Sequence, residues 1–400
     1  MTSRRILLIN HEYPPLGGGS GNTTRHVAKS LARLGHKPYV LTAGRSDLPR
    51  DELVDGVTIR RLAARSRREG AQDDRARAGS ADIMRFMASA MLAAPALCRQ
   101  WKMDAALVFF AASGGPIGWM LKRVNRLPYV LALQHGDVPL PATDDDHESG
   151  PLPKSVFGKL AGAGLDYLWR DAGVMVANSD GLAELARRHR PSSRVTVIPA
   201  GADVDGITPK EDYSPRGDVR LLYVGRLAKQ KGLDVLLPAL AKISSALKWK
   251  LTLVGDGPEW PVVAALAARL AMIDRIELRG WQGWDVLPEI YRSADIFVLP
   301  SRDEGMPAAL LEAMATGLPV VGTRIAGAGE AVLHGKTGLL VPGGNSEALA
   351  DALTQLIADP SRWEPFGRAG RARAETYYSW TNVAEKWLEV IEQAIHRARP

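Results

Sequence analysis

Four charged residues in the second half of this 400-residue chain are of the types that bind a sugar linked to a diphosphate. Glu304 and Glu312 lie on either side of a predicted helix start, and Arg226 and Lys231 follow a predicted strand. Carboxylates accept hydrogen bonds from sugar hydroxyl groups, whereas guanidinium and ammonium groups bind phosphate oxygens. Fixed cations also stabilise the negative charge that develops on a departing diphosphate. We therefore expect chemistry at a sugar–phosphate bond.

The segment that contains the two glutamates predicts a strand, a tight loop and a helix. A buried run ends at Leu299, and Pro307 falls in the first turn of the helix, where its missing N–H group costs nothing. Gly317 ends the helix, and Pro319 prevents its continuation. The free N–H groups and partial positive charge of the helix N-terminus would then face a phosphate or sugar oxygen.

This segment resembles a known family of enzymes. The Glu304-x7-Glu312 spacing, the Gly-Met-Pro after Glu304 and the run Leu-Glu-Ala-Met-Ala-Thr-Gly-Leu-Pro-Val-Val resemble the retaining GT-B glycosyltransferases of family GT4, or glycosyltransferase group 1. The resemblance implies that Glu304 contacts the transferred sugar and that Glu312 contacts the ribose. It assigns the diphosphate to Arg226 and Lys231. It also places the backbone of the helix start beside the sugar and phosphates, at Gly305, Met306 and Pro307. The alternative is a solvated pair of glutamates.

Three further turns resemble donor-binding loops of the same family. Gly225 directly follows the strand at 219–224, and Gly255 lies in a Gly-x-Gly-Pro turn after the next strand. Trp281 and Gln282 follow an Arg-Gly pair, at the position where family members hold the nucleotide base. The resemblance therefore implies donor contacts at these four residues. Gly255 could be only a turn, and Trp281 could instead pack in the interior.

A glycine-rich loop follows the first predicted strand. Residues 13–21, Tyr-Pro-Pro-Leu-Gly-Gly-Gly-Ser-Gly, resemble the loop of the family, which implies that Gly18 and Gly19 lie near the donor. Glycines let the backbone approach a ligand and present its N–H groups. A dinucleotide fingerprint is the rival interpretation. It is disfavoured because Asn22 stands in place of the last glycine and no acidic residue ends the second strand.

Two polar residues follow a buried strand in the first half. The resemblance places His135 next to the donor sugar, where it supports charge in the transition state, and allows Asp137 to contact either the acceptor or its own loop. A satisfied structural histidine is the alternative for His135. Ser179 precedes another predicted helix and is expected to cap it.

Strands and helices alternate along the chain, which predicts parallel sheets covered on both faces. The expected fold class is α/β, with two doubly wound Rossmann-like domains facing a central cleft, as in the GT-B fold. We expect an acceptor-side domain at 1–205, a nucleotide-sugar domain at 206–375 and a C-terminal helix at 376–400 that returns towards the first domain. Ligands of such folds bind at the carboxyl ends of the strands, so the cleft is the expected site.

Buried apolar runs define the strands that we expect in each domain. In the first they are residues 5–10, 37–42, 57–62, 105–110, 128–133, 173–178 and 195–199. In the second they are 219–224, 250–254, 276–279, 296–299 and 319–322. Helices are expected at 23–34, after the glycine-rich loop, and at about 380–398.

Composition and charge limit the kinds of ligand and partner that we expect the protein to bind. The net charge of +7 favours anionic ligands, but basic stretches interleaved with aromatic residues are missing, so we expect no nucleic acid. Cys98 is the single cysteine, which fits a reducing compartment. The Asp203-Val-Asp205 sequence superficially matches a metal-binding motif of another glycosyltransferase fold, but we expect it to be an interdomain turn. We expect neither a metal nor another cofactor to be required.

Membrane association is left open by the sequence. The apolar part of the N-terminus is too short for a signal peptide, and the run 86–98 is shorter than a spanning helix, so a cytoplasmic protein is expected. The basic residues at 60–61 and 65–77, with an apolar helix at 83–98, could bind an anionic surface at the inner face of the cell membrane. A core helix beside a basic loop is the equal alternative.

These features predict a retaining hexosyltransferase that uses a UDP- or GDP-sugar. The acceptor would be a glycan, a lipid-linked molecule or a small molecule, and the family resemblance suggests a role in cell-envelope or exopolysaccharide biosynthesis. The same resemblance implies a front-face displacement without a covalent intermediate. Two alternatives remain: a GT-B nucleotide-sugar epimerase, and a catalytically silent protein that binds a nucleotide sugar.

Overall fold

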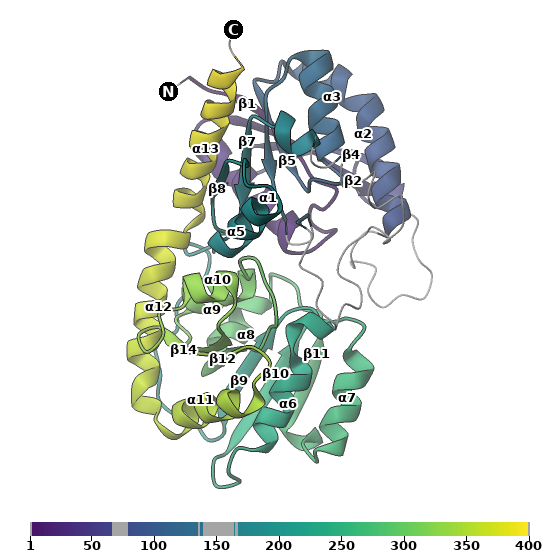
Figure 1. Cartoon of the computed structure of the whole chain (residues 1–400). Helices are drawn as coiled ribbons and strands as arrows, with labels where there is room; N and C mark the ends of the chain where they lie inside the picture. Colours follow the sequence, from purple (N-terminus) through teal and green to yellow (C-terminus); the bar gives the residue numbers. More distant parts are fainter. Residues whose placement is uncertain (1, 66–78, 135–136, 139–163, 165–166, 399–400) are drawn as a thin grey trace. The chain divides into compact units, whose positions relative to one another are not determined.

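The computed structural model divides the chain into two compact units, and it describes residues 2–65, 79–134, 137–138, 164 and 167–398. Unit 1 consists of Met1–Pro199 together with Trp380–Pro400, and unit 2 consists of Ala200–Ser379. The domain limits expected after residues 205 and 375 both fall inside unit 2, close to its ends. Figure 1 shows both units as sheets with helices packed against them.

Unit 1 is built, within its described residues, on an eight-stranded sheet with the order β3-β4-β2-β1-β5-β6-β7-β8. Only the edge pair β3 and β4 is antiparallel, and every other described pair in this sheet is parallel. The strands are β1 (Arg5–Ile9), β2 (Lys37–Arg45), β3 (Asp51–Val54), β4 (Val57–Arg65), β5 (Ala105–Phe109), β6 (Tyr129–Ala132), β7 (Val174–Ala177) and β8 (Val195–Val197).

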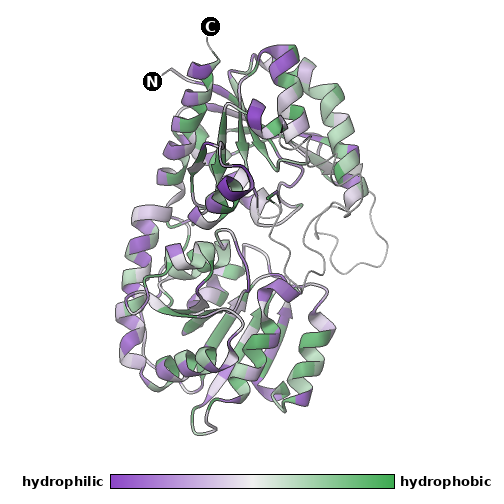
Figure 2. Ribbon diagram, viewed as in Figure 1, coloured by the Kyte–Doolittle hydropathy of each residue, from purple (hydrophilic) through white to green (hydrophobic). Residues whose placement is uncertain are grey.

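The first strand shows why this sheet is covered on both faces. Ile6 and Leu8 pack in one apolar core, whereas Leu7 and Ile9 pack in another, because side chains alternate along a strand. Residues of α1 (Gly19–Arg33) and α13 (Trp380–Arg397) contribute to the first core. The second core contains residues of α2 (Ser80–Trp101), α3 (Gly115–Asn125) and α5 (Asp180–His189). In Figure 2 the strands are accordingly mostly apolar.

Unit 2 contains a six-stranded sheet with the order β11-β10-β9-β12-β13-β14, counted over the part of the chain that the structure describes. Its strands are all parallel: β9 (Val219–Val224), β10 (Trp249–Val254), β11 (Ile276–Gly280), β12 (Ile296–Leu299), β13 (Val320–Thr323) and β14 (Gly338–Val341). Residues of α6 (Leu233–Ala241), α7 (Trp260–Arg269) and α11 (Ser346–Ala358) pack on one face. On the other face pack residues of α8 (Leu287–Ser293), α9 (Ala308–Thr316), α10 (Ala326–Ala331) and α12 (Trp363–Tyr378).

The predicted class, two doubly wound α/β units, is confirmed, but several details differ from expectation. The sequence missed β3, because its Asp-Glu-Leu-Val sequence is short and exposed at the sheet edge, and it missed β14. Helix α1 begins at Gly19 rather than at residue 23, so the last three residues of the glycine-rich loop are helical. Pro307 is the N-cap of α9 and not its first-turn residue. As predicted, the Ser179 hydroxyl caps α5 by accepting the N–H of Leu182.

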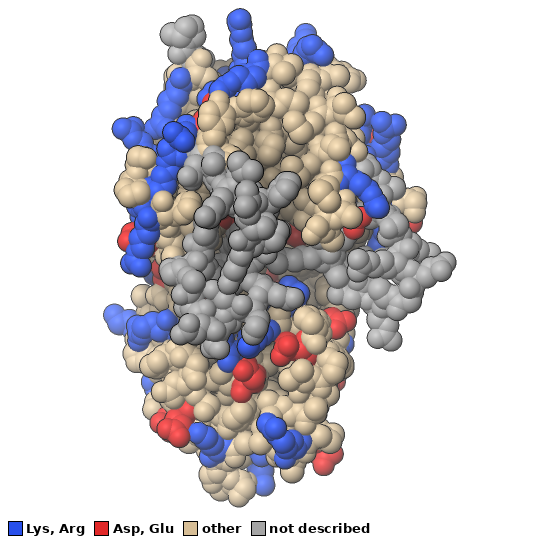
Figure 3. All heavy atoms as spheres, turned by 45° about the vertical axis from the view of Figure 1, so that its right-hand side comes forward, with Lys and Arg blue, Asp and Glu red and all other residues tan. Residues whose placement is uncertain are grey.

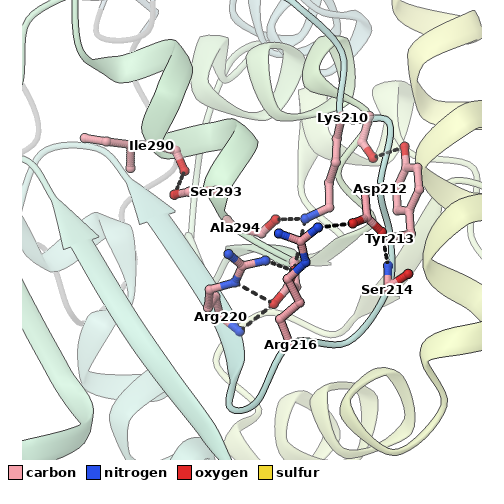
Figure 4. A network of polar contacts seen from close by, with 11 residues as sticks. Lys210, Asp212, Tyr213, Ser214, Arg216, Arg220, Ile290, Ser293 and Ala294 are labelled. Carbon is pink, nitrogen blue, oxygen red and sulfur yellow. Dashed lines mark hydrogen bonds and ion pairs between the residues drawn. The ribbon is translucent and has the colours of Figure 1, made fainter.

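A buried polar network, shown in Figure 4, holds the segment at the start of unit 2 in place. The sequence of this segment has no apolar periodicity. The Lys210 ammonium donates to the carbonyl of Ala294 at 2.6 Å and to the carboxylate of Asp295 at 3.0 Å. Arg220 on β9 donates to the same carboxylate through its backbone N–H and its guanidinium. Burial favours the neutral form of Asp295, but these hydrogen bonds and charges outweigh it and keep its pKa low. The buried carboxylate therefore joins the segment to the amino ends of β9 and β12.

Helix α2 is the one described helix that is long and apolar enough to cross a membrane, by length and composition alone. It has 22 residues and is longer than the apolar run seen in the sequence. Its Phe86, Ala90 and Leu97 pack in the core of unit 1. A core helix passes the same test, so the helix by itself is weak evidence for a membrane span.

Charged side chains are dispersed on the face of the molecule shown in Figure 3. On that face, lysine and arginine side chains are seen on both units, and most of the visible acidic side chains lie on unit 2. The net charge of +7 belongs to the whole chain, of which this view shows one face.

Candidate functional site

The candidate site lies at the carboxyl edge of the sheet in unit 2. Because all strands of this sheet are parallel, the loops that follow them emerge at the same edge. Backbone hydrogen bonds join these loops: the N–H of Gly225 donates to the carbonyl of Val254 at 2.9 Å, and the N–H of Gly255 donates to that of Gly280 at 2.8 Å. The loops thus form one connected layer along the sheet edge.

Two glycines allow neighbouring loops of this layer to touch through their backbones. A β-carbon at Gly232 would lie 2.1 Å from the carbonyl oxygen of Pro300. A β-carbon at Gly327 would lie 1.9 Å from the carbonyl oxygen of Gly305. Neither position can hold a side chain without moving a backbone. The loop after β12 is therefore packed directly against the loop after β9 and against the first turn of α10.

Lys231 and Glu304, predicted from distant parts of the sequence, form an ion pair. Lys231 ends the short η1 turn (Lys229–Lys231) after β9, and Glu304 lies in the loop after β12. The buried hydroxyl of Ser301 donates to the same carboxylate at 2.9 Å. The side chains of Lys231 and Glu304 are 19% and 11% exposed, so both are largely shielded from solvent but can still be reached by a ligand. A sugar hydroxyl and a phosphate oxygen could be bound at adjacent points here.

Glu312 is a buried carboxyl group on α9. Its neighbours along the helix, Leu310, Leu311 and Ala313 among them, are apolar and buried, so the group is removed from water. Burial raises the pKa of Glu312 to about 7, although a hydrogen bond of 2.9 Å from the Tyr291 hydroxyl favours the ionised form. The alternative that Glu312 is a solvated helix position is therefore wrong.

The start of α9 presents a buried backbone segment beside Glu304. Gly305, Met306 and Pro307 are all buried, and no side chain accepts a hydrogen bond at the N-cap of this helix. The N–H of Leu310 donates to the carbonyl of Pro307 at 3.2 Å, and the positive end of the α9 dipole at this segment favours an oxygen ligand. The sequence predicted a helix start at this point, and its role in binding the sugar and phosphates stays a prediction.

The other predicted donor residues follow the ends of β9, β10 and β11. Arg226 has an exposed side chain, and its carbonyl accepts the Tyr223 hydroxyl at 2.8 Å. Trp281 is 47% exposed, so it is not an interior residue, and the side chain of Gln282 donates to the carbonyl of Arg279. Together with Gly225 and Gly255, these residues lie along the same sheet edge.

The structure describes some of the site residues that were predicted in unit 1, but not all of them. His135 lies outside the described residues. Gly18 and Gly19 are exposed, and a β-carbon at either would meet nothing within 4 Å, so a ligand has room to approach. The N–H of Gly18 donates to the Glu12 carboxylate at 3.2 Å, which orients this loop from within.

Asp137 is buried and held by its own surroundings. Its carboxylate accepts the N–H of Gln134 at 2.8 Å and receives further hydrogen bonds from the backbones of Ala111 and Ala112. Burial outweighs these hydrogen bonds and raises the pKa of Asp137 to about 6. Of the two roles expected from the sequence, acceptor or loop, these contacts favour the second, because the backbone already occupies the carboxylate.

Several polar residues at these edges were missed in the sequence. In unit 1, His11 and Glu12 come after β1 and Asn10, and the imidazole of His11 lies 3.1 Å from the hydroxyl of Ser113. Polar residues immediately after a buried strand were the available signal. In unit 2, Arg302 binds Asp234, a contact across 68 residues for which the sequence holds no signal.

Clustered metal ligands are not seen in the described part of the chain. No group of three or more His, Cys, Asp or Glu side chains among these residues could hold a metal ion. In particular, the Asp203 carboxylate accepts a hydrogen bond from the N–H of Gly206 at 3.1 Å, as expected for a turn.

Comparison with known proteins gives the family. A family model described as "Glycosyl transferase 4-like domain" matches residues 18–201, and one described as "Glycosyl transferases group 1" matches residues 218–359. The GDP-mannose-dependent alpha-(1-6)-phosphatidylinositol monomannoside mannosyltransferase of Mycobacterium tuberculosis is 28% identical over 417 residues, covering 97% of this chain and 98% of that protein. The glycogen synthase of the same species is 29% identical over 409 residues, covering 96% and 94%.

The fold is also found among solved structures. A sucrose-phosphate synthase from Thermosynechococcus elongatus matches with a TM-score of 0.83 at 22% identity, covering 98% of this chain and all of that one. At this identity the likeness concerns the fold alone. The two matching models cover most of both units, and Lys231 and Glu304, two of the residues expected from the GT4 pattern, meet at one sheet edge of unit 2. The chain belongs to the GT4 family of glycosyltransferases, with the GT-B fold.

Proposed function

We propose that the protein is a retaining hexosyltransferase that uses a nucleotide diphosphate sugar, either a UDP-sugar or a GDP-sugar. The observation that carries the proposal is the ion pair between Lys231 and Glu304. An ammonium group suits a phosphate oxygen and a carboxylate suits a sugar hydroxyl, so the pair fits the two sides of a sugar–phosphate bond. The two residues reach each other from the loops after β9 and β12.

In the proposed reaction, an acceptor hydroxyl attacks the anomeric carbon on the face from which the diphosphate leaves. The new carbon–oxygen bond forms as the bond from the anomeric carbon to the phosphate oxygen breaks, and the leaving oxygen accepts the proton of the acceptor. Lys231 and Arg226 stabilise the charge on the diphosphate, and Glu304 orients the sugar. No metal ion or other cofactor is required in this proposal, because the cations of the protein perform this role.

The remaining donor contacts are assigned by position. Glu312 accepts hydrogen bonds from the ribose hydroxyls, and the loop with Trp281 and Gln282 holds the base. His135 is proposed as a further catalytic residue, and its substitution by alanine is the direct check. Gly18 and Gly19 are proposed to contact the donor through their backbone.

The acceptor is proposed to be a glycan, a lipid-linked molecule or a small molecule. The names of the two mycobacterial relatives, which include a phosphatidylinositol mannoside and glycogen, support the first two classes. We propose a role in cell-envelope or polysaccharide biosynthesis, in the cytoplasm and at the inner face of the cell membrane. Nucleic acid is not a proposed partner.

A thermal-shift panel tests the donor. It contains UDP, GDP and ADP with UDP-glucose, UDP-galactose, GDP-mannose and ADP-glucose, and the true donor raises the melting temperature because it binds only the folded state. Glu304→Ala and Lys231→Ala should lose this shift. Lys229→Ala is the matched control, because it removes a neighbouring positive charge from the same turn without touching Glu304.

Turnover assays then distinguish the proposed transferase from an epimerase and from a silent binding protein. Release of the nucleoside diphosphate with an acceptor, and a product whose anomeric proton in NMR shows the configuration of the donor, are the expected results. A rearranged sugar formed from the donor alone would indicate an epimerase. Binding without any release of nucleoside diphosphate would indicate a silent binding protein. Inversion of the anomeric centre would contradict the proposed mechanism.

A further inference from the structure

Arg302 joins two loops of the candidate site. Its backbone N–H donates to the carbonyl of Gln230 at 2.8 Å, and its Nη1 donates to the carbonyl of Lys229 at 2.8 Å. The same guanidinium makes two hydrogen bonds, each of 2.7 Å, to the carboxylate of Asp234. Arg302 therefore holds both the η1 turn and the first residues of α6.

The atoms that Arg302 binds are directly next to the proposed phosphate-binding lysine. Lys229 and Gln230 precede Lys231 in the η1 turn, and Glu304 follows Arg302 in its own loop. A shift of the turn relative to this loop would change the distance between the Lys231 ammonium and the Glu304 carboxylate. The contacts of Arg302 oppose such a shift.

The Arg302–Asp234 pair remains charged at neutral pH. Burial by itself would raise the pKa of Asp234, but the hydrogen bonds and charge of Arg302 outweigh it and lower the pKa below its ordinary value. The side chains are 37% and 41% exposed, and ion pairs this exposed add little to global stability. A planar guanidinium that binds a carboxylate and a carbonyl together does, however, restrict the geometry of what it binds.

We propose that Arg302, held by Asp234, is a positioning residue that fixes Lys231 where it binds the diphosphate of the donor. This inference rests on the proposed function and adds a residue to it. Arg302 acts through the η1 turn and does not itself touch the donor. Its loss should therefore weaken binding of the second phosphate, while contacts to the base and ribose, made elsewhere, remain.

The ratio of mononucleotide to diphosphate dissociation constants measures this effect. Isothermal titration calorimetry with GDP against GMP, and UDP against UMP, gives the ratio for the wild type without any need for turnover. Arg302→Ala should lower the ratio about tenfold, the size of one lost charge-assisted contact, and should change the mononucleotide affinity less than about twofold. Arg302→Lys keeps the positive charge but not the planar guanidinium, so its ratio should lie between those of the wild type and Arg302→Ala.

Two further variants sharpen the test. Asp234→Asn should lower the same ratio, and combining it with Arg302→Ala should add little, because both act through one contact. Arg368→Ala is the matched control, since it breaks an exposed arginine–glutamate pair on α12 and should leave the ratio unchanged. Unfolding curves for each variant show that the protein remains folded.

Three outcomes would overturn the inference. If the ratio is unchanged in Arg302→Ala but falls in Lys231→Ala, Lys231 is positioned without Arg302. If mononucleotide and diphosphate affinities fall equally, Arg302 supports unit 2 as a whole. If the wild type binds none of the four nucleotides while it is folded, the proposed function fails first, and this inference fails with it.

Discussion

The backbone of Gly232 lies against the carbonyl oxygen of Pro300, so closely that a β-carbon at position 232 would be 2.1 Å from that oxygen. Gly232 also has a φ of +69°, a conformation that other residues adopt only with strain. It directly follows Lys231, and Pro300 precedes the loop that carries Glu304. One glycine therefore determines how closely the two halves of the ion pair approach.

Substitution of Gly232 by alanine should damage the site beyond the cost of its backbone conformation. The collision with Pro300 must push the two loops apart, so Gly232→Ala should lower both the melting temperature and the affinity for nucleoside diphosphates. Gly335→Ala is the control, because Gly335 has a φ of +75° but nothing within 4 Å of its β-carbon position. That variant should show only the conformational cost of about 1 kcal/mol. Equal losses in both variants would mean that the close contact is unimportant.

Nucleotide binding should release a proton from Glu312 near neutral pH. The pKa of Glu312 in the free protein is raised to about 7, so part of the population is protonated there. Ribose hydroxyls that donate to the carboxylate favour its ionised form, which lowers the pKa on binding, and affinity should therefore fall as the pH decreases below about 7. Calorimetry at about pH 6.5 in two buffers with different ionisation enthalpies measures the proton.

The Glu312→Gln variant provides the control for this proton release. Glutamine cannot ionise but can still accept the Tyr291 hydroxyl, so its binding enthalpy should be the same in both buffers. Identical enthalpies in both buffers for the wild type as well would show that Glu312 does not change its protonation on binding.

Asp137 should stabilise unit 1 rather than determine acceptor affinity. In Asp137→Asn the amide nitrogen faces backbone N–H donors that the carboxylate accepted, so the free energy of unfolding should fall by about 1–3 kcal/mol. Urea denaturation at neutral pH measures the change, with Glu389→Gln on the exposed side of α13 as the control. An unchanged unfolding midpoint combined with a large rise in the KM of the acceptor would instead support the acceptor role.

The outward side of α2 allows a test of membrane association. Leu92 is 84% exposed and Met84 is 63% exposed, although the opposite side of the helix packs in the core. If the helix rests on a membrane, the protein should sediment with phosphatidylglycerol vesicles and not with phosphatidylcholine vesicles, and Leu92→Glu should reduce sedimentation. Failure of the wild type to sediment at low salt would remove the membrane proposal.

Much of the fold could be predicted because its strands are buried on both faces. Runs such as β1 and β12 are continuously apolar, and only a parallel sheet between two helical layers needs such sequences. That Lys231 and Glu304 lie near each other could be anticipated because both follow strands of one sheet, but their ion pair was not predicted. The edge strand β3 could not, since it is short, polar and exposed, and its pairing depends on the hairpin with β4.

The contacts that support the candidate site could not be predicted from the sequence, for a different reason. Arg302 and Asp234 are ordinary charged residues in their local sequence, and only the folded chain brings them together. In the same way, Asp137 follows a strand as an acceptor ligand would, but its carboxylate turns inward to the backbone. Sequence patterns locate the sheet edge, whereas side-chain direction at that edge is decided by tertiary packing.

The interrupted course of unit 1 through the chain has a consequence for biosynthesis. Helix α13 supplies Trp387, Ile391 and Ala394 to one face of the unit 1 sheet, and Glu392 pairs with Arg4 at the other end of the sequence. All of unit 2 leaves the ribosome before this helix does. The unit translated first therefore waits, with an uncovered apolar surface, until the unit translated second is already able to fold.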